Sequence, residues 1–258
     1  MRIISYNVNG IRAAIKKGFI DWLATDPADI ICLQETKALI TDIKVEDFEA
    51  LGYKPYWFSA QKKGYSGVAF LSKIAPSEVV YGSSIEQSDF EGRVINATFN
   101  GITIVNAYFP SGTSGDERQT YKYQWLAEFE EYLEQLRKTT PNLVITGDYN
   151  IAHTEIDIHD PKGNKKSSGF LPEERAWFTQ FLGKGYVDSF RKIHPDTLGA
   201  YSWWSQRFPS VRLQNKGWRI DYICTTNTLE NSIKDAYILP DVKHSDHCPI
   251  YVELDSQL

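Results

Sequence analysis

The sequence predicts an α/β protein with mixed β-sheets, folded as a single domain over residues 1–258. Three observations support this fold class. Short apolar runs alternate with segments of helical period. A strong hairpin signal lies among the apolar runs. A chain of 258 residues that is 42% apolar can bury one sizeable core.

Several of the apolar runs end in a polar residue. Because the sheet should be partly parallel, we expect these polar groups to gather at the tips of the strands. The runs and the polar residues that follow them are 3–6 before Asn7, 29–33 before Gln34 and Glu35, 104–107 before Tyr108, and 143–147 before Asp148.

The remaining elements are read from turn signals and periodicity. Residues 94–109 form two β-rich arms around Asn100-Gly101, which predicts an antiparallel hairpin and rules out an all-parallel sheet. Apolar residues at three- and four-residue steps predict an amphipathic helix over 120–139. A second helix is expected after Pro172, with Glu173 and Glu174 in its first turn, and much of 153–170 is expected to be loop.

Charge, cysteine content and the lack of long apolar runs indicate where the protein functions. The formal net charge is −5, but residues 161–219 hold 11 Lys or Arg against 4 Asp or Glu, a local excess of +7. The three cysteines, Cys32, Cys224 and Cys248, are widely spaced in apolar sequence and are expected to be buried thiols. No apolar run approaches the length of a membrane span, and the N-terminus lacks the pattern of a signal peptide. We therefore expect an intracellular protein without a membrane partner.

Nine polar residues at strand ends form the candidate site. Any one of them alone is better explained as a turn or cap residue, since Asn and Asp after strands make turns and caps. Together they are rich in oxygen, contain histidine and lack cysteine, which suits a hard ion such as Mg²⁺ or Mn²⁺ and a phosphate ester as substrate. They are Asn7, Asn9, Glu35, Tyr108, Asp148, Asn150, Asp221, Asp246 and His247.

Seven motifs in order resemble those of the exonuclease III family of apurinic/apyrimidinic (AP) endonucleases, within the endonuclease/exonuclease/phosphatase superfamily. The segment 153–170 is similar to a DNA-contacting stretch of these repair enzymes and separates the chain from secreted DNase I relatives. The resemblance implies a DNase I-like four-layer α/β sandwich, in which two packed mixed β-sheets are flanked by helices. The motifs are NVNGIR (7–12), LQETK (33–37), EGRVI (91–95), NAYFP (106–110), GDYNIAH (147–153), GWRIDY (217–222) and SDHCPI (245–250).

The resemblance also implies a mechanism, in which water attacks a DNA phosphodiester in line and no covalent intermediate forms. Glu35 anchors Mg²⁺, for which Mn²⁺ can substitute. Asn7, Asn9 and Asp246 lie close to the ion or its waters.

The remaining catalytic roles follow from the same resemblance. Asp148, positioned by Asn150, deprotonates the water. His247, held by Asp221, donates to a phosphate oxygen. Tyr108 lies near the leaving oxygen or the phosphate, and the division of acid and base roles between Asp148 and Tyr108 stays open.

The DNA-binding residues fall into two groups. Trp203, Trp218 and Ile220 occupy places similar to the family's pocket for the flipped-out abasic sugar, among cations of the basic segment. The lysines in the second group are equally well explained as solvated charges on loops. The positions expected against the DNA backbone are Arg12, Lys17, Tyr65, Asn164, Lys165 and Ser167.

The expected partner is double-stranded DNA that contains abasic sites or blocked 3′ ends. Incision 5′ to the abasic site would leave a 3′-hydroxyl, and the same site would support 3′-phosphodiesterase, 3′-phosphatase and 3′→5′ exonuclease activity. We expect a cytoplasmic, bacterial-type monomer whose substrate lies in the nucleoid. Two alternatives remain: a phosphoesterase of the same fold that acts on RNA, lipid or inositol phosphates, and a DNA-binding module without catalysis.

Two departures from the family pattern are visible. Asn9 stands where some members carry Asp, which removes one carboxylate from the metal site and predicts weaker metal affinity. Residues 111–115 read SGTSG where some relatives carry an Arg or Asn. The contacts expected with the DNA strand opposite or beside the lesion are therefore altered.

Overall fold

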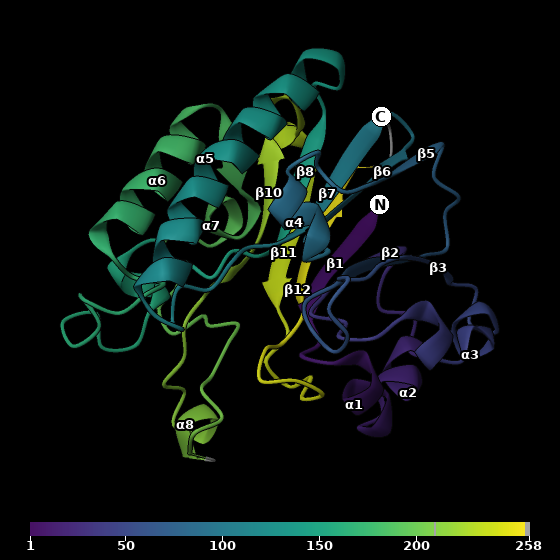
Figure 1. Cartoon of the computed structure of the whole chain (residues 1–258), viewed down its shortest axis with the longest axis horizontal. Helices are drawn as coiled ribbons and strands as arrows, with labels where there is room; N and C mark the ends of the chain where they lie inside the picture. The colour runs from purple at the N-terminus through teal and green to yellow at the C-terminus, as the bar shows by residue number, and fades with distance from the viewer. Residues whose placement is uncertain (209, 256–258) are drawn as a thin grey trace.

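A computed structural model describes residues 1–208 and 210–255, and its two six-stranded mixed sheets pack face to face (Figure 1). The first sheet has the order β11-β12-β1-β2-β4-β3 and the second has the order β5-β6-β7-β8-β10-β9. The strands of the first sheet are β1 (Arg2–Asn7), β2 (Ile30–Gln34), β3 (Lys54–Phe58), β4 (Val68–Ser72), β11 (Ile233–Ile238) and β12 (Ile250–Leu254). Those of the second are β5 (Glu78–Tyr81), β6 (Val94–Phe99), β7 (Ile102–Tyr108), β8 (Leu143–Asp148), β9 (Tyr186–Asp188) and β10 (Asp221–Thr226).

The central core lies between the two sheets. Ile3 of β1, Ile104 of β7 and Val144 of β8 are fully buried there, and the rings of Phe70 and Phe99 meet edge to face across the interface with centroids 6.2 Å apart. Strands β1 and β2 pair in parallel, as do β7 and β8, while the other pairs are antiparallel. Each sheet is therefore mixed, as the hairpin signal predicts.

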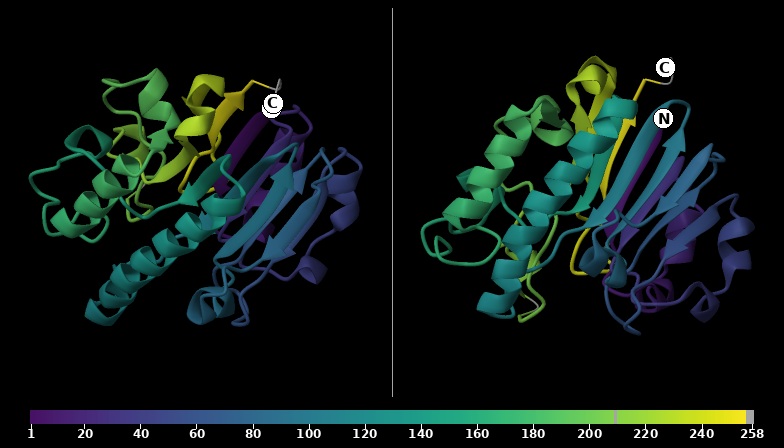
Figure 2. Two further views of the ribbon diagram at one scale, coloured as in Figure 1. Left: turned by 90° about the horizontal axis from the view of Figure 1, so that it is seen from above. Right: turned by 45° about the horizontal axis from the view of Figure 1, so that its top comes forward.

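Helices cover the outer faces of both sheets. Helices α1 (Ile11–Lys16), α2 (Phe19–Leu23) and α3 (Val45–Glu49) lie on the side of the first sheet, whereas α5 (Asp116–Thr139) and α6 (Pro172–Gly183) lie on the side of the second (Figures 1 and 2). Helix α7 (Ser189–Ile193) packs against both β10 of the second sheet and β11 of the first. The four-layer sandwich is confirmed. The shorter elements are α4 (Glu86–Phe90), α8 (Ser210–Leu213) and the 3₁₀ turns η1 (Ile40–Asp42), η2 (Glu155–Asp157) and η3 (Asn227–Ser232).

Most elements expected from the sequence occur where expected. Strands β6 and β7 form the hairpin, with Phe99 opposite Ile102. Helix α6 begins at Pro172, and only η2 interrupts the loop over 153–170. Helix α5 starts at Asp116, four residues before the predicted 120, because acidic residues favour the first turn of a helix even where the apolar pattern has not begun. All three cysteines are buried.

The topology brings the ends of β1, β2, β7 and β8 to one edge of the sandwich. Asn7, Tyr108 and Asp148 are the last residues of their strands, and Glu35 follows β2 directly. In residues 1–208 and 210–255, no helix combines the length and the apolar character needed to cross a membrane.

Candidate active site

Strand pairing places the candidate carboxylates side by side. Asp148 is the register partner of Tyr108 in parallel β7 and of Asp221 in antiparallel β10. Gly147 makes this approach possible, because its φ is +144° and a Cβ there would lie 1.7 Å from the carbonyl oxygen of Ala107. Gly147 therefore allows the end of β8 to approach β7 closely, which places the Asp148 carboxylate beside Tyr108.

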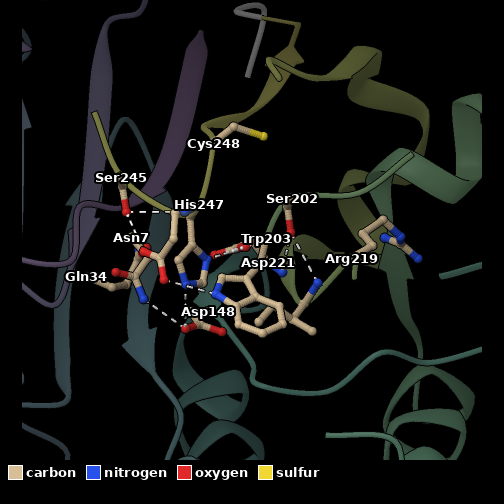
Figure 3. Close-up of polar contacts among 12 residues, drawn as sticks. Asn7, Gln34, Asp148, Ser202, Trp203, Arg219, Asp221, Ser245, His247 and Cys248 are labelled. Carbon is tan, nitrogen blue, oxygen red and sulfur yellow. Dashed lines mark hydrogen bonds and ion pairs between the residues drawn. The ribbon is translucent and has the colours of Figure 1, made fainter. Parts of the chain in front are cut away.

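Asp148, His247 and Asp221 form a buried row (Figure 3). The Nδ1 of His247 lies 2.9 Å from Oδ2 of Asp221, which also accepts a hydrogen bond of 2.6 Å from the Ser202 hydroxyl. The Nε2 of His247 is 3.8 Å from Oδ2 of Asp148, which is beyond hydrogen-bonding distance. Asp221 thus orients the ring and leaves its other nitrogen available to a bound group.

The protonation of this row follows from burial and charge. Burial alone disfavours the charged imidazole, but the charge and hydrogen bond of Asp221 raise the pKa of His247 to about 10. Burial, with the charge of Asp221, raises the pKa of Asp148 to about 7. At neutral pH the site therefore contains a positively charged hydrogen-bond donor, His247. Beside it lies the carboxylate of Asp148, whose affinity for a proton is high for an aspartate.

Two asparagines fix the Asp148 carboxylate. The Nδ2 of Asn7 donates to Oδ2 of Asp148 and to Oε1 of Glu35, each at 2.9 Å. The backbone N of Asn150 donates to Oδ1 of Asp148 at 2.8 Å. Asn150 has a φ of +52°, a conformation that asparagine tolerates better than most residues. Asn7 therefore links the two carboxylates, and Asn150 holds Asp148 from the opposite side.

Glu35, Asp148 and His247 offer donor atoms that all lie within 4.8 Å of one another, close enough to share a metal ion. Because His247 bonds Asp221 and is held in its charged form, it offers no lone pair to an ion, and the carboxylate of Glu35 is the suitable anchor. Oxygen donors of this kind fit a hard divalent cation. Glu35 also pairs with Lys37, whose Nζ lies 2.7 Å from Oε2, so a cation already neutralises this carboxylate.

Asn9 and Asp246 lie beside this cluster and bond each other. The Nδ2 of Asn9 donates to Oδ1 of Asp246 at 2.9 Å, while its Oδ1 accepts from Lys37 at 2.5 Å. The other oxygen of Asp246 accepts from the Trp203 indole at 3.1 Å. The four residues expected near the metal ion therefore form two hydrogen-bonded pairs. Asn7 bonds Glu35, and Asn9 bonds Asp246.

The site opens into a cleft of about 900 Å³. One end is apolar, because Trp203, Trp218 and Ile220 pack with buried Ile158 and Phe170. The two indole rings are perpendicular, with centroids 6.0 Å apart. The predicted residues that line the cleft are Glu35, Tyr108, Asp148, Asn150, Ser167, Trp203, Trp218, Ile220, Asp246 and His247.

The other predicted DNA-binding residues lie outside the cleft lining. Arg12 and Lys17 are exposed on and just after α1, and Lys165 is exposed on the 153–170 loop. Asn164 donates to the carbonyl oxygens of His159 and Asp160, so its amide group stabilises that loop. Asn7 and Asp221 are buried behind the cleft.

Sequence reasoning missed the group that supports Tyr108. The guanidinium of fully buried Arg93 lies 4.8 Å from the centre of the Tyr108 ring and donates to the Tyr108 carbonyl oxygen at 2.9 Å. Arg93 also pairs with Glu91 and donates to the Tyr65 hydroxyl at 3.1 Å. The motif EGRVI contains both charged residues, but its pattern does not reveal that they contact Tyr108 and Tyr65.

A second ionic cluster fixes the loop that begins after β8. Asp157 accepts from Arg219 at 2.7 Å and from Arg191 at 2.6 Å, and the backbone N of Arg219 donates to the Asp157 carbonyl oxygen at 2.7 Å. Burial alone would raise the pKa of Asp157, but the two guanidinium groups hold it well below its ordinary value. The cluster ties the 153–170 loop to the segment that carries Trp218.

Asp157→Asn is expected to lower stability at neutral pH, and the deficit relative to wild type should shrink as the pH falls. A carboxyl with a depressed folded-state pKa stabilises the protein above its unfolded-state pKa of about 4 and loses that contribution below it. Thermal unfolding from pH 7 to pH 3 measures both effects. Glu155→Gln, at an exposed position nearby, is the control and should leave the curve unchanged. A deficit that stays constant with pH would contradict the assignment.

Fold and site together define a hydrolase of phosphate esters, and the comparisons specify the family. The model of the "Endonuclease/Exonuclease/phosphatase family" matches residues 4–247. The chain belongs to this family.

Relatives and solved structures agree with this membership. The chain is 47% identical to the exodeoxyribonuclease of Bacillus subtilis (strain 168) over 97% of this chain and 98% of that one. It is 44% identical to the DNA repair nuclease APEX1 of Danio rerio, over 97% and 81%. An AP endonuclease from Archaeoglobus fulgidus superposes with a TM-score of 0.90 at 33% identity, covering 99% of both chains. The resemblance to the exonuclease III family is thereby confirmed.

Proposed function

We propose that this protein is a Mg²⁺-dependent DNA-repair nuclease that incises the backbone 5′ to an abasic site and leaves a 3′-hydroxyl. The observation that carries the proposal is the cleft itself. It joins the Asp148, His247 and Glu35 cluster to an apolar end formed by Trp203 and Trp218. The relatives are exodeoxyribonucleases and AP endonucleases, and they act on DNA.

The residues divide the work of hydrolysis. Asp148, with a pKa of about 7, takes the proton of the attacking water and is held for this task by Asn7 and Asn150. His247 donates from Nε2 to a phosphate oxygen and stabilises the charge that develops there. Asp221 keeps the imidazole charged and oriented. Tyr108, beside Asp148 in the parallel register, donates near the leaving oxygen.

Glu35 would anchor the metal ion, with Asn7, which donates to its carboxylate, and the bonded pair Asn9 and Asp246 close to the ion or its waters. When bound, Mg²⁺ supplies positive charge that polarises the scissile phosphate. Mn²⁺, which takes the same oxygen ligands, is expected to substitute.

The apolar end of the cleft selects the lesion. A base-free deoxyribose is small and partly apolar, so it fits against Trp203, Trp218 and Ile220 where a complete nucleotide is excluded. Extrusion of the sugar costs least where base pairing is already lost. The same hydrolysis of the bond between phosphorus and the 3′ oxygen, at a chain end, would give the 3′-phosphodiesterase, 3′-phosphatase and exonuclease activities. Exposed Arg12, Lys17 and Lys165 would contact backbone phosphates.

Asn9→Asp is expected to tighten Mg²⁺ binding, on the order of tenfold, because a further carboxylate raises the charge of the ligand set. The new carboxylate would also face Asp246 and lose the hydrogen bond that Asn9 donates to it, and a cation relieves that repulsion. Calorimetric titration with Mg²⁺ measures the change. Asn100→Asp, in the exposed turn of the β6–β7 hairpin, adds the same charge elsewhere and is the control. Equal affinity of the Asn9→Asp protein and wild type would contradict the prediction.

The function is tested with a labelled duplex that carries one tetrahydrofuran abasic analogue, incubated with Mg²⁺ or with EDTA. An undamaged duplex with a recessed 3′ end is treated in parallel. We expect Mg²⁺-dependent incision 5′ to the analogue, much faster than digestion of the plain end. If neither duplex is cut, the proposal fails and RNA, lipid or inositol phosphoesters become the substrates to examine. If DNA is bound but not cut, the chain is a binding module.

A further inference from the structure

A lysine and a glutamate form an ion pair that is completely buried beneath the cleft. The Nζ of Lys122, on α5, lies 2.6 Å from Oε1 of Glu174, on α6, and both side chains have 0% exposure. Neither side chain lines the cleft. The pair is therefore outside the catalytic group described above, although it lies directly behind it.

Lys122 reaches the catalytic group through Asn150. Its Nζ donates to the backbone oxygen of Asn150 at 2.8 Å. The backbone N of the same residue donates to the Asp148 carboxylate, and its side chain donates to the carbonyl oxygen of Phe109 at 3.0 Å. Asn150 has positive φ, and the partners of its peptide groups help to hold this orientation. Lys122 is one of those partners.

Glu174 holds the end of the loop over 153–170. Its Oε2 accepts from the backbone N of Gly169 at 2.6 Å and from that of Leu171 at 3.0 Å. Gly169 lies against the site, since a Cβ there would be 3.0 Å from the Asn150 oxygen and 3.1 Å from the Trp218 ring. Its own carbonyl oxygen accepts from Ala152 at 2.7 Å. Glu174 thus sets the position of the loop that carries Lys165 and Ser167.

Stability alone does not account for such a pair. Apolar residues of similar volume in place of a buried ion pair often leave stability unchanged or raise it. The charged groups here instead make directed hydrogen bonds to three backbone groups, at Asn150, Gly169 and Leu171. Apolar side chains would fill the space without making those bonds.

We propose that Lys122 and Glu174 are a pair of positioning residues that couples the DNA-binding loop to the catalytic Asp148. Lys122 sets the Asn150 peptide, and through it the carboxylate that accepts the water's proton. Glu174 sets the loop end against Asn150 and Trp218. The inference rests on the proposed function, since it assigns the pair a role in DNA cleavage.

Two double variants separate the two roles without leaving a lone buried charge. Lys122→Met/Glu174→Gln removes the donor to the Asn150 oxygen, while the amide oxygen at position 174 still accepts from Gly169 and Leu171. Lys122→Met/Glu174→Ala removes the loop anchor as well. Single-turnover incision of the tetrahydrofuran duplex in Mg²⁺ measures the chemistry. Fluorescence anisotropy of the same duplex in EDTA measures binding.

The first variant is expected to cut about 10²-fold more slowly, as displaced catalytic groups do, with its Kd for DNA close to that of wild type. The second is expected to show the same loss of rate together with weaker binding. Leu133→Ala, a core truncation on the same helix, is the matched control. It should lower the Tm and leave rate and Kd unchanged at temperatures well below unfolding.

A wild-type rate in the first variant would overturn the inference. So would an equal loss of rate in Leu133→Ala, because the effect would then be general destabilisation. Unchanged DNA binding in the second variant would remove the role of Glu174. These failures differ from a failure of the proposed function, in which the wild-type protein itself does not cut the duplex.

Discussion

Asp148→Asn is expected to lower the single-turnover rate of incision by about 10³-fold, within the range for loss of a general base. Asparagine keeps the shape of the side chain, but it cannot accept the proton of the attacking water. Quenched-flow or manual single-turnover assays on the tetrahydrofuran duplex measure the rate.

DNA binding distinguishes this loss from misfolding. In EDTA the Asp148→Asn protein should bind the duplex at least as tightly as wild type, because a buried negative charge near the phosphate is removed. Asp196→Asn makes the same chemical change at an exposed position and should leave the rate unchanged. A rate near that of wild type for Asp148→Asn would require another residue to act as the base, and Tyr108 is its neighbour in the sheet.

His247→Gln is expected to lower the rate by about 10²–10³-fold, as loss of one charge-stabilising donor does. The pKa of about 10 means that His247 is charged at neutral pH, so glutamine at this position removes the positive charge and leaves only a neutral, weaker hydrogen-bond donor. Single-turnover rates at saturating enzyme measure the effect without interference from product release.

A substitution at Asp221 tests whether this residue acts through His247. Its carboxylate contacts His247 and the Ser202 hydroxyl, but it does not line the cleft. Asp221→Asn should therefore act mainly through the imidazole. Because the Asp221 charge also raises the pKa of Asp148, the double variant with His247→Gln should be only slightly slower than His247→Gln alone. Multiplication of the two single effects in the double variant would show that Asp221 has an independent role.

Local patterns predicted the elements that present the site. The Asn100-Gly101 turn predicted the hairpin of β6 and β7, and the apolar runs predicted where β1, β2, β7 and β8 end. These features depend on turn chemistry and on the alternation of side chains, which are properties of short segments. The gathering of Asn7, Glu35 and Asp148 then follows from the meeting of strand ends at one edge.

Other parts of the site depend on contacts between distant segments. The Lys122 and Glu174 pair joins two helices whose sequences show only an amphipathic pattern, and a buried lysine is an exception to that pattern. The pairing of Asn9 with Asp246 joins positions at opposite ends of the chain. Arg93 reaches Tyr108 and Tyr65 only because β6 and β7 are adjacent to the loop before β4. No spacing within a single segment carries this information.

In the proposed mechanism, water activated at Asp148 attacks the phosphorus and breaks its bond to the 3′ oxygen. Incision of the tetrahydrofuran duplex in ¹⁸O-labelled water, followed by mass spectrometry of both fragments, shows which bond is broken. We expect one ¹⁸O atom in the 5′-phosphate of the fragment that carries the analogue, and an unlabelled 3′-hydroxyl on the other fragment. A label at the 3′ end, or fragments without label, would contradict this mechanism.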